Sequence, residues 1–296
     1  MTGPQVASEL HVGCAMWAHK GWLGKWFPGD TSAGSELSAY ATWCTGVEGN
    51  TSFYAVPSEQ ASARWVEQVP PDFRFCFKLP RTITHDRRLQ NAEGELADFL
   101  LRLEPMAPLL GPIQIQLPAS LGPDSLPQLR SFLGRLPTSF DWAVEVRHLD
   151  FFVGGSAERP FDDLLASPGV NRVVLDSRTL FAVAPITTPE HDAWKAKPRV
   201  PVRPVATASQ PLVRLIGRTD TDGSLDDWAP WYPKIAEWIS RGLRPHVFAH
   251  TPDNLEAPRL ARSVWERIND AMAPGALALA PLPTPRRPAE QLQVEV

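Results

Sequence analysis

A stretch near the middle of the chain carries charged side chains at a spacing that suits chemistry. Residues 141–148 read Asp-Trp-Ala-Val-Glu-Val-Arg-His, in which two valines alternate with Glu145 and Arg147. Alternation with a period of two predicts a β-strand with one apolar and one charged face. Several neighbouring stretches repeat this pattern. We therefore expect their polar faces to converge inside a closed sheet.

The polar positions of the other predicted strands extend this set. Alternate residues of a strand point to opposite faces of the sheet. If the apolar face of each strand packs against helices, the other face points into the barrel. The interior set is then Glu48, Asn50, Lys78, Gln114, Gln116, Glu145, Arg147, Asp176, Arg214 and His250. Removing such charges from water costs several kcal/mol each unless they are paired. A balanced network that only fixes the fold is one interpretation. We favour a functional site, because most of these residues lie at the carboxyl ends of strands.

This mixture of carboxylates, amides and cations is suited to acid–base chemistry on a small anionic substrate. We predict Glu48 and Glu145 as proton-transfer residues whose environments separate their pKa values. Lys78 is the third catalytic candidate, since a desolvated lysine beside Arg147 would have a lowered pKa and could form a Schiff base. Cations would hold the anionic group, and amides would orient hydroxyls. The substrate-binding candidates are Asn50, Gln116, Arg147, Asp176, Arg214, His250, Trp17 and His85.

Two other functions stay open. Metal-dependent phosphodiester hydrolysis, as in barrel-type apurinic endonucleases, would draw its ligands from Glu48, Glu145, Asp176, His148 and His250. The loose spacing and the neighbouring cations count against it, so we assign no metal ligands and predict no cofactor, although a divalent metal is compatible with the donor set. The third function is a non-catalytic metabolite-binding protein. Replacing Glu48 by Ala would lower the affinity of a binder, whereas an enzyme could keep affinity and lose turnover.

Composition narrows the class of protein. The chain has 296 residues and a formal net charge of −4, so nucleic acid is an unfavoured partner. Cys14, Cys44 and Cys76 show no paired spacing, which indicates buried thiols in a reducing compartment. We find neither a signal peptide nor an apolar stretch long enough to cross a bilayer. We expect a cytoplasmic protein without a membrane anchor, and the oligomeric state is left open.

Strand and helix patterns alternate along the chain. The predicted strands are 10–15, 47–50, 73–79, 113–117, 141–148, 172–176, 211–217 and 246–250. Helical patterns at 35–45, 58–69, 96–103, 126–136, 161–166, 224–239 and 260–268 separate or follow them, with Ser58 as an N-cap and Ser224 with Asp227 as a capping box. Eight such units predict an α/β fold, a single TIM-type (β/α)8 barrel. An open doubly wound sheet would have apolar central strands and a Gly-rich first turn, and neither is found.

The predicted domain organisation is simple. Residues 1–9 form a flexible leader, 10–272 the barrel, and 273–296 a disordered Pro/Ala-rich tail. A proline-rich basic insertion at 179–210 shows no helical period. It could be a lid that meets an anionic substrate, but we favour a solvated crossover loop. The tryptophans of the first loop could either stack on a ring or form a hydrophobic lid.

Several motifs, in one order along the chain, resemble the YecE-like family, which is catalogued as domain of unknown function 72. They are 47–54 (VEGNTSFY), 73–78 (FRFCFK), 84–85 (TH), 116–118 (QLP), 144–148 (VEVRH), 173–178 (VVLDSR) and 248–253 (FAHTPD). The resemblance implies a TIM barrel, in agreement with the strand count, and implies no established activity. Residues 215–217 and 249–250 depart from the motifs of other members. An activity found elsewhere in the family therefore need not apply to this chain.

Overall fold

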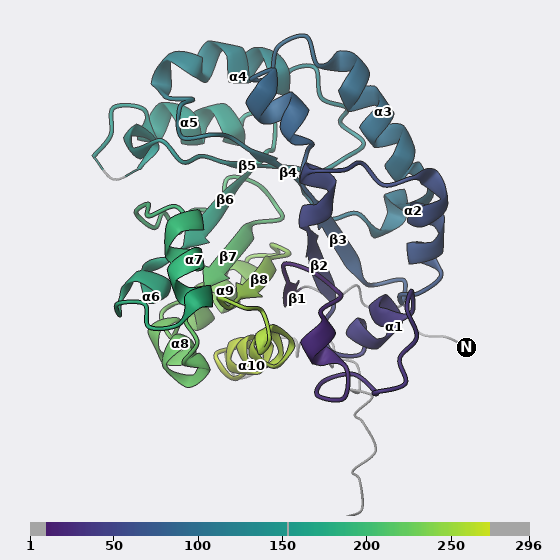
Figure 1. The fold of residues 1–296 in the computed structure, drawn as a ribbon. Coiled ribbons are helices and arrows are strands. Elements are labelled where there is room, and N and C mark those ends of the chain that lie inside the picture. Colours follow the sequence, from purple (N-terminus) through teal and green to yellow (C-terminus); the bar gives the residue numbers. More distant parts are fainter. Residues whose placement is uncertain (1–9, 153, 273–296) are drawn as a thin grey trace, which may run out of the picture.

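Eight parallel strands form a nearly closed barrel in the computed structural model, which describes residues 10–152 and 154–272. The predicted leader 1–9 and tail 273–296 lie outside the described residues. The strands are β1 (His11–Cys14), β2 (Gly46–Gly49), β3 (Arg74–Phe77), β4 (Ile113–Gln116), β5 (Trp142–Glu145), β6 (Asn171–Asp176), β7 (Leu212–Ile216) and β8 (His246–His250). Their order in the sheet is β3-β2-β1-β8-β7-β6-β5-β4 (Figure 1). All eight predicted strands and the predicted barrel are confirmed.

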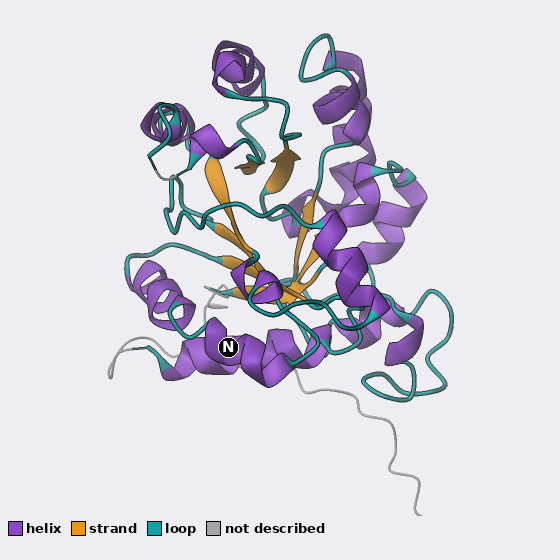
Figure 2. Cartoon of the chain, turned by 60° about the vertical axis from the view of Figure 1, so that its left-hand side comes forward, coloured by secondary structure: helices purple, strands orange, loops and turns teal. Residues whose placement is uncertain are grey.

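Helices surround the strands on the outside (Figure 2). They are α1 (Glu36–Tyr40), α2 (Glu59–Val66), α3 (Glu93–Leu103), α4 (Leu126–Leu133), α5 (Glu158–Ala166), α6 (Arg178–Phe181), α7 (Thr188–Ala196), α8 (Thr221–Asp227), α9 (Trp231–Ser240) and α10 (Ala257–Asp270). Ser58 caps α2 as predicted, because its hydroxyl accepts a hydrogen bond from the amide of Ala61. The main hydrophobic core lies between the helices and the outer face of the strands.

The barrel closes between β3 and β4, where the two strands form no continuous ladder. Two isolated parallel bridges join them, Phe75 with Leu110 and Lys78 with Gln114. The amide of Leu79 donates to the carbonyl of Gln114 at 2.8 Å. The first and last strands of the sheet order are therefore held together by short local contacts.

A small apolar layer fills the barrel below its carboxyl-terminal mouth. Its members are Cys76, Ala143, Val173, Leu212 and Phe248, all at most 5% exposed. Four of them precede a polar residue of the same strand or strand end by two positions, and side chains two apart point to the same face. This layer therefore forms an apolar floor under the polar side chains at the mouth.

Two local predictions are wrong. The insertion at 179–210 contains α7, which begins with a capping box between Thr187 and Glu190. The sequence carries this signal, since a threonine is followed three residues later by a glutamate. Ser224 and Asp227 do not form the predicted capping box, because both lie inside α8. That helix is capped by the side chain of Asp220.

Two of the predictions made from composition concern the cysteines and membrane-spanning segments. Cys14, Cys44 and Cys76 are buried free thiols, as predicted. Among the described residues, no helix has the length and apolar character that are needed to cross a membrane.

We predict that Gly13 cannot be enlarged. A Cβ atom there would lie 1.8 Å from the carbonyl oxygen of Gly46 and 2.5 Å from the hydroxyl oxygen of Tyr40, so β1 and β2 would have to separate. Gly13→Ala should lower the free energy of unfolding by about 3 kcal/mol or more. Gly94→Ala is the matched control, because a Cβ atom at that position in α3 meets nothing within 4 Å. It should leave stability unchanged or raise it by about 0.5–1 kcal/mol. Equal effects of the two substitutions in denaturant unfolding would contradict the prediction.

Candidate active site at the barrel mouth

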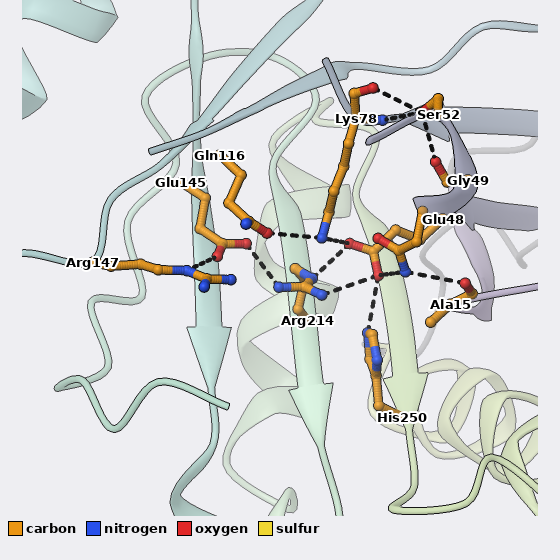
Figure 3. Close-up of polar contacts among 11 residues, drawn as sticks. Ala15, Glu48, Gly49, Ser52, Lys78, Gln116, Glu145, Arg147, Arg214 and His250 are labelled. Atoms are coloured by element: carbon orange, nitrogen blue, oxygen red, sulfur yellow. Dashed lines mark hydrogen bonds and ion pairs between the residues drawn. The ribbon is translucent and has the colours of Figure 1, made fainter. Parts of the chain in front are cut away.

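One guanidinium group joins two carboxylates from opposite sides of the barrel mouth (Figure 3). Arg214 of β7 places its Nε 2.6 Å from Oε1 of Glu48, at the end of β2. Its Nη1 donates to Oε2 of Glu145, at the end of β5, at 2.8 Å. The three side chains are at most 4% exposed. Because buried charges are costly when unpaired, this bridge is what allows both carboxylates to stay ionised inside the barrel.

Lys78 brings a second cation to the same carboxylate. Its Nζ donates to Oε1 of Gln116 at 2.9 Å and lies 3.6 Å from Oε1 of Glu48. The backbone at Lys78 is fixed by Ser52, whose hydroxyl donates to the Lys78 carbonyl and accepts from its amide. Ser52 belongs to η2 (Asn50–Phe53), the 3-10 turn directly after β2. The loop after β2 therefore positions the lysine at the end of β3.

Arg147 and Asn50 keep polar atoms without protein partners. Arg147 donates through Nε to Oε1 of Glu145 at 2.9 Å, and its side chain is 23% exposed. Within the described parts of the chain, its two terminal nitrogens make no hydrogen bond. Asn50 donates to the Ala15 carbonyl and to Glu48, whereas its Oδ1 has no donor among the described residues. Both groups are suited to binding a ligand. The Asn50 oxygen is a buried polar atom, which is unfavourable when it stays unsatisfied, and the guanidinium of Arg147 offers paired donors to an anion.

The ion pairs set the protonation states of the carboxylates. Burial raises the pKa of Glu145, but the charges of Arg214 and Arg147 outweigh burial and lower this pKa to about 2. The pKa of Glu48 is held well below its usual range, because Arg214 and Lys78 outweigh burial there too. Both groups are therefore ionised at neutral pH. Both pKa values are lowered because a single guanidinium stabilises both carboxylates, so neither group is a protonated acid at neutral pH.

The side-chain amine of Lys78 has a pKa closer to neutral pH than the carboxylates of the network have. Burial lowers its pKa to about 8, and the charge of Arg214 acts in the same direction. The lowered pKa expected for this lysine is confirmed, with burial as the main cause. At pH 7 roughly a tenth of the Lys78 side chains then carry an uncharged amine. His250, with Nε2 3.1 Å from Glu48, has its pKa lowered by burial to about 3, so it is neutral.

A cavity of about 440 Å³ opens above this network. It is lined by Asn50, Phe53, Tyr54, Lys78, Arg81, His85, Gln116, Arg147, Ala196, Lys197 and Arg214. These residues lie in or after five strands, β2, β3, β4, β5 and β7, and at the end of α7. The volume lies within the range of sites that bind small metabolites.

Comparison with known proteins agrees with this architecture. Residues 11–287 match the family described as Protein of unknown function DUF72. The chain belongs to the DUF72 family. The UPF0759 protein YecE of Escherichia coli K12 is 41% identical over 263 residues, which cover 89% of this chain and 94% of that protein. The protein of the same name from Escherichia coli O157:H7 is 40% identical over the same shares. The resemblance to the YecE-like family is thus confirmed.

Crystal structures of DUF72 proteins share the barrel. A DUF72 family protein of Thermotoga maritima MSB8 superposes with a TM-score of 0.67 at 20% identity, and the match covers 87% of this chain and 98% of that one. A DUF72 family protein of Enterococcus faecalis V583 gives a TM-score of 0.57 at 20% identity, with coverage of 80% and 95%. At these identities the likeness establishes the common fold.

The structure of this DUF72 chain brings most of the predicted site residues together. Those that line the cavity or contact its charged network are Glu48, Asn50, Lys78, His85, Gln116, Glu145, Arg147, Arg214 and His250. His250 lies behind Glu48 and does not line the cavity. Their catalytic and binding roles stay predictions.

The prediction that Asp176 faces the barrel interior is wrong. Its carboxylate accepts hydrogen bonds from Nε1 of Trp231, the first residue of α9, at 2.8 Å and from Nη2 of Arg178 at 2.7 Å. The inner face of β6 carries Val173 instead. The sequence pattern assigns Asp176 to the wrong face of the strand because residues 173–175 are three consecutive apolar residues, so alternation cannot tell the two faces apart.

Trp17 does not line the cavity either. It packs edge-on against Trp65 of α2, with 5.0 Å between ring centroids, and against Phe75 on the outer face of β3. Trp22 and Trp26 donate their indole N–H groups to the loop after β8, at the carbonyls of residues 254 and 255. The tryptophans of the first loop therefore contact neighbouring elements and the loop after β8, and none of them lines the cavity.

Sequence reasoning missed Lys197 as a site residue. It follows α7 and lines the cavity, and burial lowers its pKa to about 8. The segment after it is held in place, since Arg203 pairs with Glu158 at 3.1 Å and with Asp162 at 3.0 Å. The insertion therefore contributes a lysine to the cavity, while most of its residues stay exposed or half-buried. The basic composition of the insertion was the signal that pointed to the site.

Of the residues proposed as metal ligands, Glu48, Glu145 and His250 belong to the network at the mouth, whereas Asp176 and His148 lie elsewhere. The described parts of the chain contain no group of three or more histidine, cysteine, aspartate and glutamate side chains that could hold a metal ion. The oxygens of Glu48 and Glu145 contact cations, Asp176 points to the helix layer, and His148 lines a different pocket. This donor arrangement does not fit a divalent metal, and we derive no chemistry through one.

We predict a pH-dependent stability that depends on Lys78. Its pKa falls from 10.5 to about 8 on folding, so the unfolded chain binds more protons between these values and stability rises with pH in that window. Relative to Lys78→Met, the free energy of unfolding of the native protein should rise by roughly 2 kcal/mol between pH 7 and 10. Denaturant unfolding across this range measures the difference. Lys20 is exposed, so Lys20→Met should follow the native protein. A constant difference between native protein and Lys78→Met would refute the assignment.

Proposed function

We propose that this protein is an enzyme that acts on a small anionic metabolite, with Lys78 as its proton-transfer group. The observation that carries the proposal is the charge at the barrel mouth. Four cationic side chains, Lys78, Arg147, Lys197 and Arg214, meet only two carboxylates there. When all six groups are ionised, the site has an excess of positive charge. An anionic ligand would restore the balance.

The roles follow from the contacts of each side chain. The free terminal nitrogens of Arg147 suit bidentate binding of a carboxylate or phosphate group. The unpaired Oδ1 of Asn50 is placed to accept a hydrogen bond from a substrate hydroxyl. These two groups would orient the substrate over the mouth of the barrel.

Lys78 supplies the chemistry in this proposal. A pKa of about 8 lies near the pH of the cell interior, and a general base is most effective when its pKa is close to the working pH. The uncharged amine takes a proton from the substrate, and the ammonium group that forms is stabilised by Glu48, 3.6 Å away. Glu48 and Glu145 then act through charge and positioning, because their lowered pKa values make them weak bases. This assigns proton transfer to the lysine instead of the carboxylates.

Lys78→Met tests the proposal. The native protein is incubated with a defined library of carboxylated and phosphorylated metabolites, and depletion of each compound is followed by mass spectrometry. We expect at least one compound to be consumed, with turnover at least about 100-fold lower for Lys78→Met. Lys20→Met, which removes an exposed lysine, should retain native turnover.

The same library separates an enzyme from a non-catalytic binding protein. Each compound is also tested for a rise in melting temperature, since a ligand that binds only the folded state stabilises it. A compound that stabilises the native protein and is never consumed would favour the binding protein. Loss of turnover in Lys78→Met without loss of the thermal shift supports the catalytic role of the lysine.

A further inference from the structure

Three aromatic side chains form one side of the cavity. Phe53 and Tyr54 follow β2, and His85 follows β3. Phe53 packs edge-on against both neighbours, with 5.1 Å between its ring centroid and that of Tyr54 and 5.0 Å to that of His85. All three line the cavity. We call these residues the aromatic wall.

Tyr54 is unusually exposed for an aromatic residue, at 78% of its surface. A large ring that stays in water does not stabilise the fold as a buried ring would. Exposed aromatic side chains beside a cavity are typical of ligand-binding surfaces. The ring borders a cavity that is also lined by charged side chains. It therefore offers a stacking surface next to an anion site.

The backbone that carries His85 is irregular. Residues Thr82–Asp86 form a π-helix, the only one among the described residues. Such turns are rare and are frequent at functional sites. A contact of 2.9 Å between Oγ1 of Thr84 and Nδ1 of His85 fixes the orientation of the imidazole. Burial, with the charges of Arg147 and Arg81, lowers the pKa of His85, so its imidazole is uncharged at neutral pH.

The aromatic wall is coupled to the charged network by the backbone. Ser52, which precedes Phe53, holds both the amide and the carbonyl of Lys78. The turn that fixes the lysine thus also fixes the two rings. The cavity is also lined by cationic side chains, of which Arg147 and Lys197 make no hydrogen bond through their terminal nitrogens within the described residues. Arg81, which pairs with Asp86, belongs to the same lining. We call the aromatic wall the aromatic half of the lining and these cations its cationic half.

We infer that the ligand of this cavity carries a planar ring beside its anionic group, with the ring against Phe53 and Tyr54 and the anionic group at Arg147 and Lys197. This inference rests on the proposed function and names the substrate class of the same site. A simple anion would use only the cationic half, and a neutral ring only the aromatic half. A ring-bearing carboxylate or phosphate uses both, and its flat face matches the exposed face of Tyr54 better than a puckered aliphatic ring does.

Isothermal titration of the intact protein with matched probes tests the inference. The probes are phenyl phosphate, cyclohexyl phosphate, inorganic phosphate, benzoate, cyclohexanecarboxylate and benzyl alcohol. We expect each aromatic anion to bind at least fivefold more tightly than its cyclohexyl counterpart, and inorganic phosphate to bind more weakly than phenyl phosphate. Benzyl alcohol should bind at least tenfold more weakly than the aromatic anions. The phosphate and carboxylate pairs identify which anionic group the cationic half prefers.

Two variants assign the halves to residues. Tyr54→Leu should remove the preference for the aromatic anion and leave the Kd of inorganic phosphate within twofold of the native value. Arg147→Gln should weaken every anion at least tenfold. Leu101→Ala, which removes an exposed apolar side chain on α3 at 59% exposure, is the control and should change nothing.

The outcomes separate this inference from the proposed function. The planar ring is ruled out if phenyl and cyclohexyl phosphate bind equally tightly, or if the preference for the aromatic anion persists in Tyr54→Leu. In that case the anion site is still supported if Arg147→Gln weakens the binding of the anions. Binding of benzyl alcohol as tight as that of phenyl phosphate overturns the anionic half. If neither the anions nor the alcohol bind, both the inference and the anionic substrate of the proposed function are wrong.

Discussion

The interior of this barrel depends on a single guanidinium that is shared by two carboxylates. Arg214 reaches Glu48 and Glu145 from a strand that is adjacent to neither of theirs, so the contact spans the barrel. Without it, two ionised groups would lie in a dry interior, and an uncompensated buried charge destabilises a fold by several kcal/mol. The carboxylates of the bridge stay ionised, whereas Lys78 and Lys197 have pKa values lowered to about 8. Stability and chemistry are thus set by the same few atoms.

Much of this arrangement was predictable from local patterns. In β5, β7 and β8 one face is entirely apolar and the other carries all the polar residues, so alternation identifies Glu145, Arg214 and His250 as inward-facing. In β6 the same reasoning fails. That strand is apolar on both faces, and its charged residues Arg172 and Asp176 bind partners in the helix layer. The order and number of elements follow from periodicity, whereas the face of a strand with no clear alternation depends on its tertiary neighbours.

The missing parts of the site come from segments without periodicity. Lys197 lines the cavity, and the residue after it is held by a hydrogen bond from the Ser177 hydroxyl to the Pro198 carbonyl, whereas its own sequence shows only a basic, proline-rich run. Phe53 and Tyr54 lie in and just after a 3-10 turn, where spacing carries little information about direction. The rule that loops after strands gather at the mouth locates such residues roughly. Only the packed structure shows which of them face the cavity.

The seam between β3 and β4 gives the site a mechanical role. The strands meet there through isolated bridges, and local opening begins where backbone pairing is sparse. Lys78 stands on one side of this seam and Gln116 on the other, and their side chains are joined by a hydrogen bond of 2.9 Å. The polar network therefore helps to close the barrel between β3 and β4. A ligand that contacts both sides of the seam would strengthen this closure, so binding in the cavity would stabilise the barrel wall against local opening.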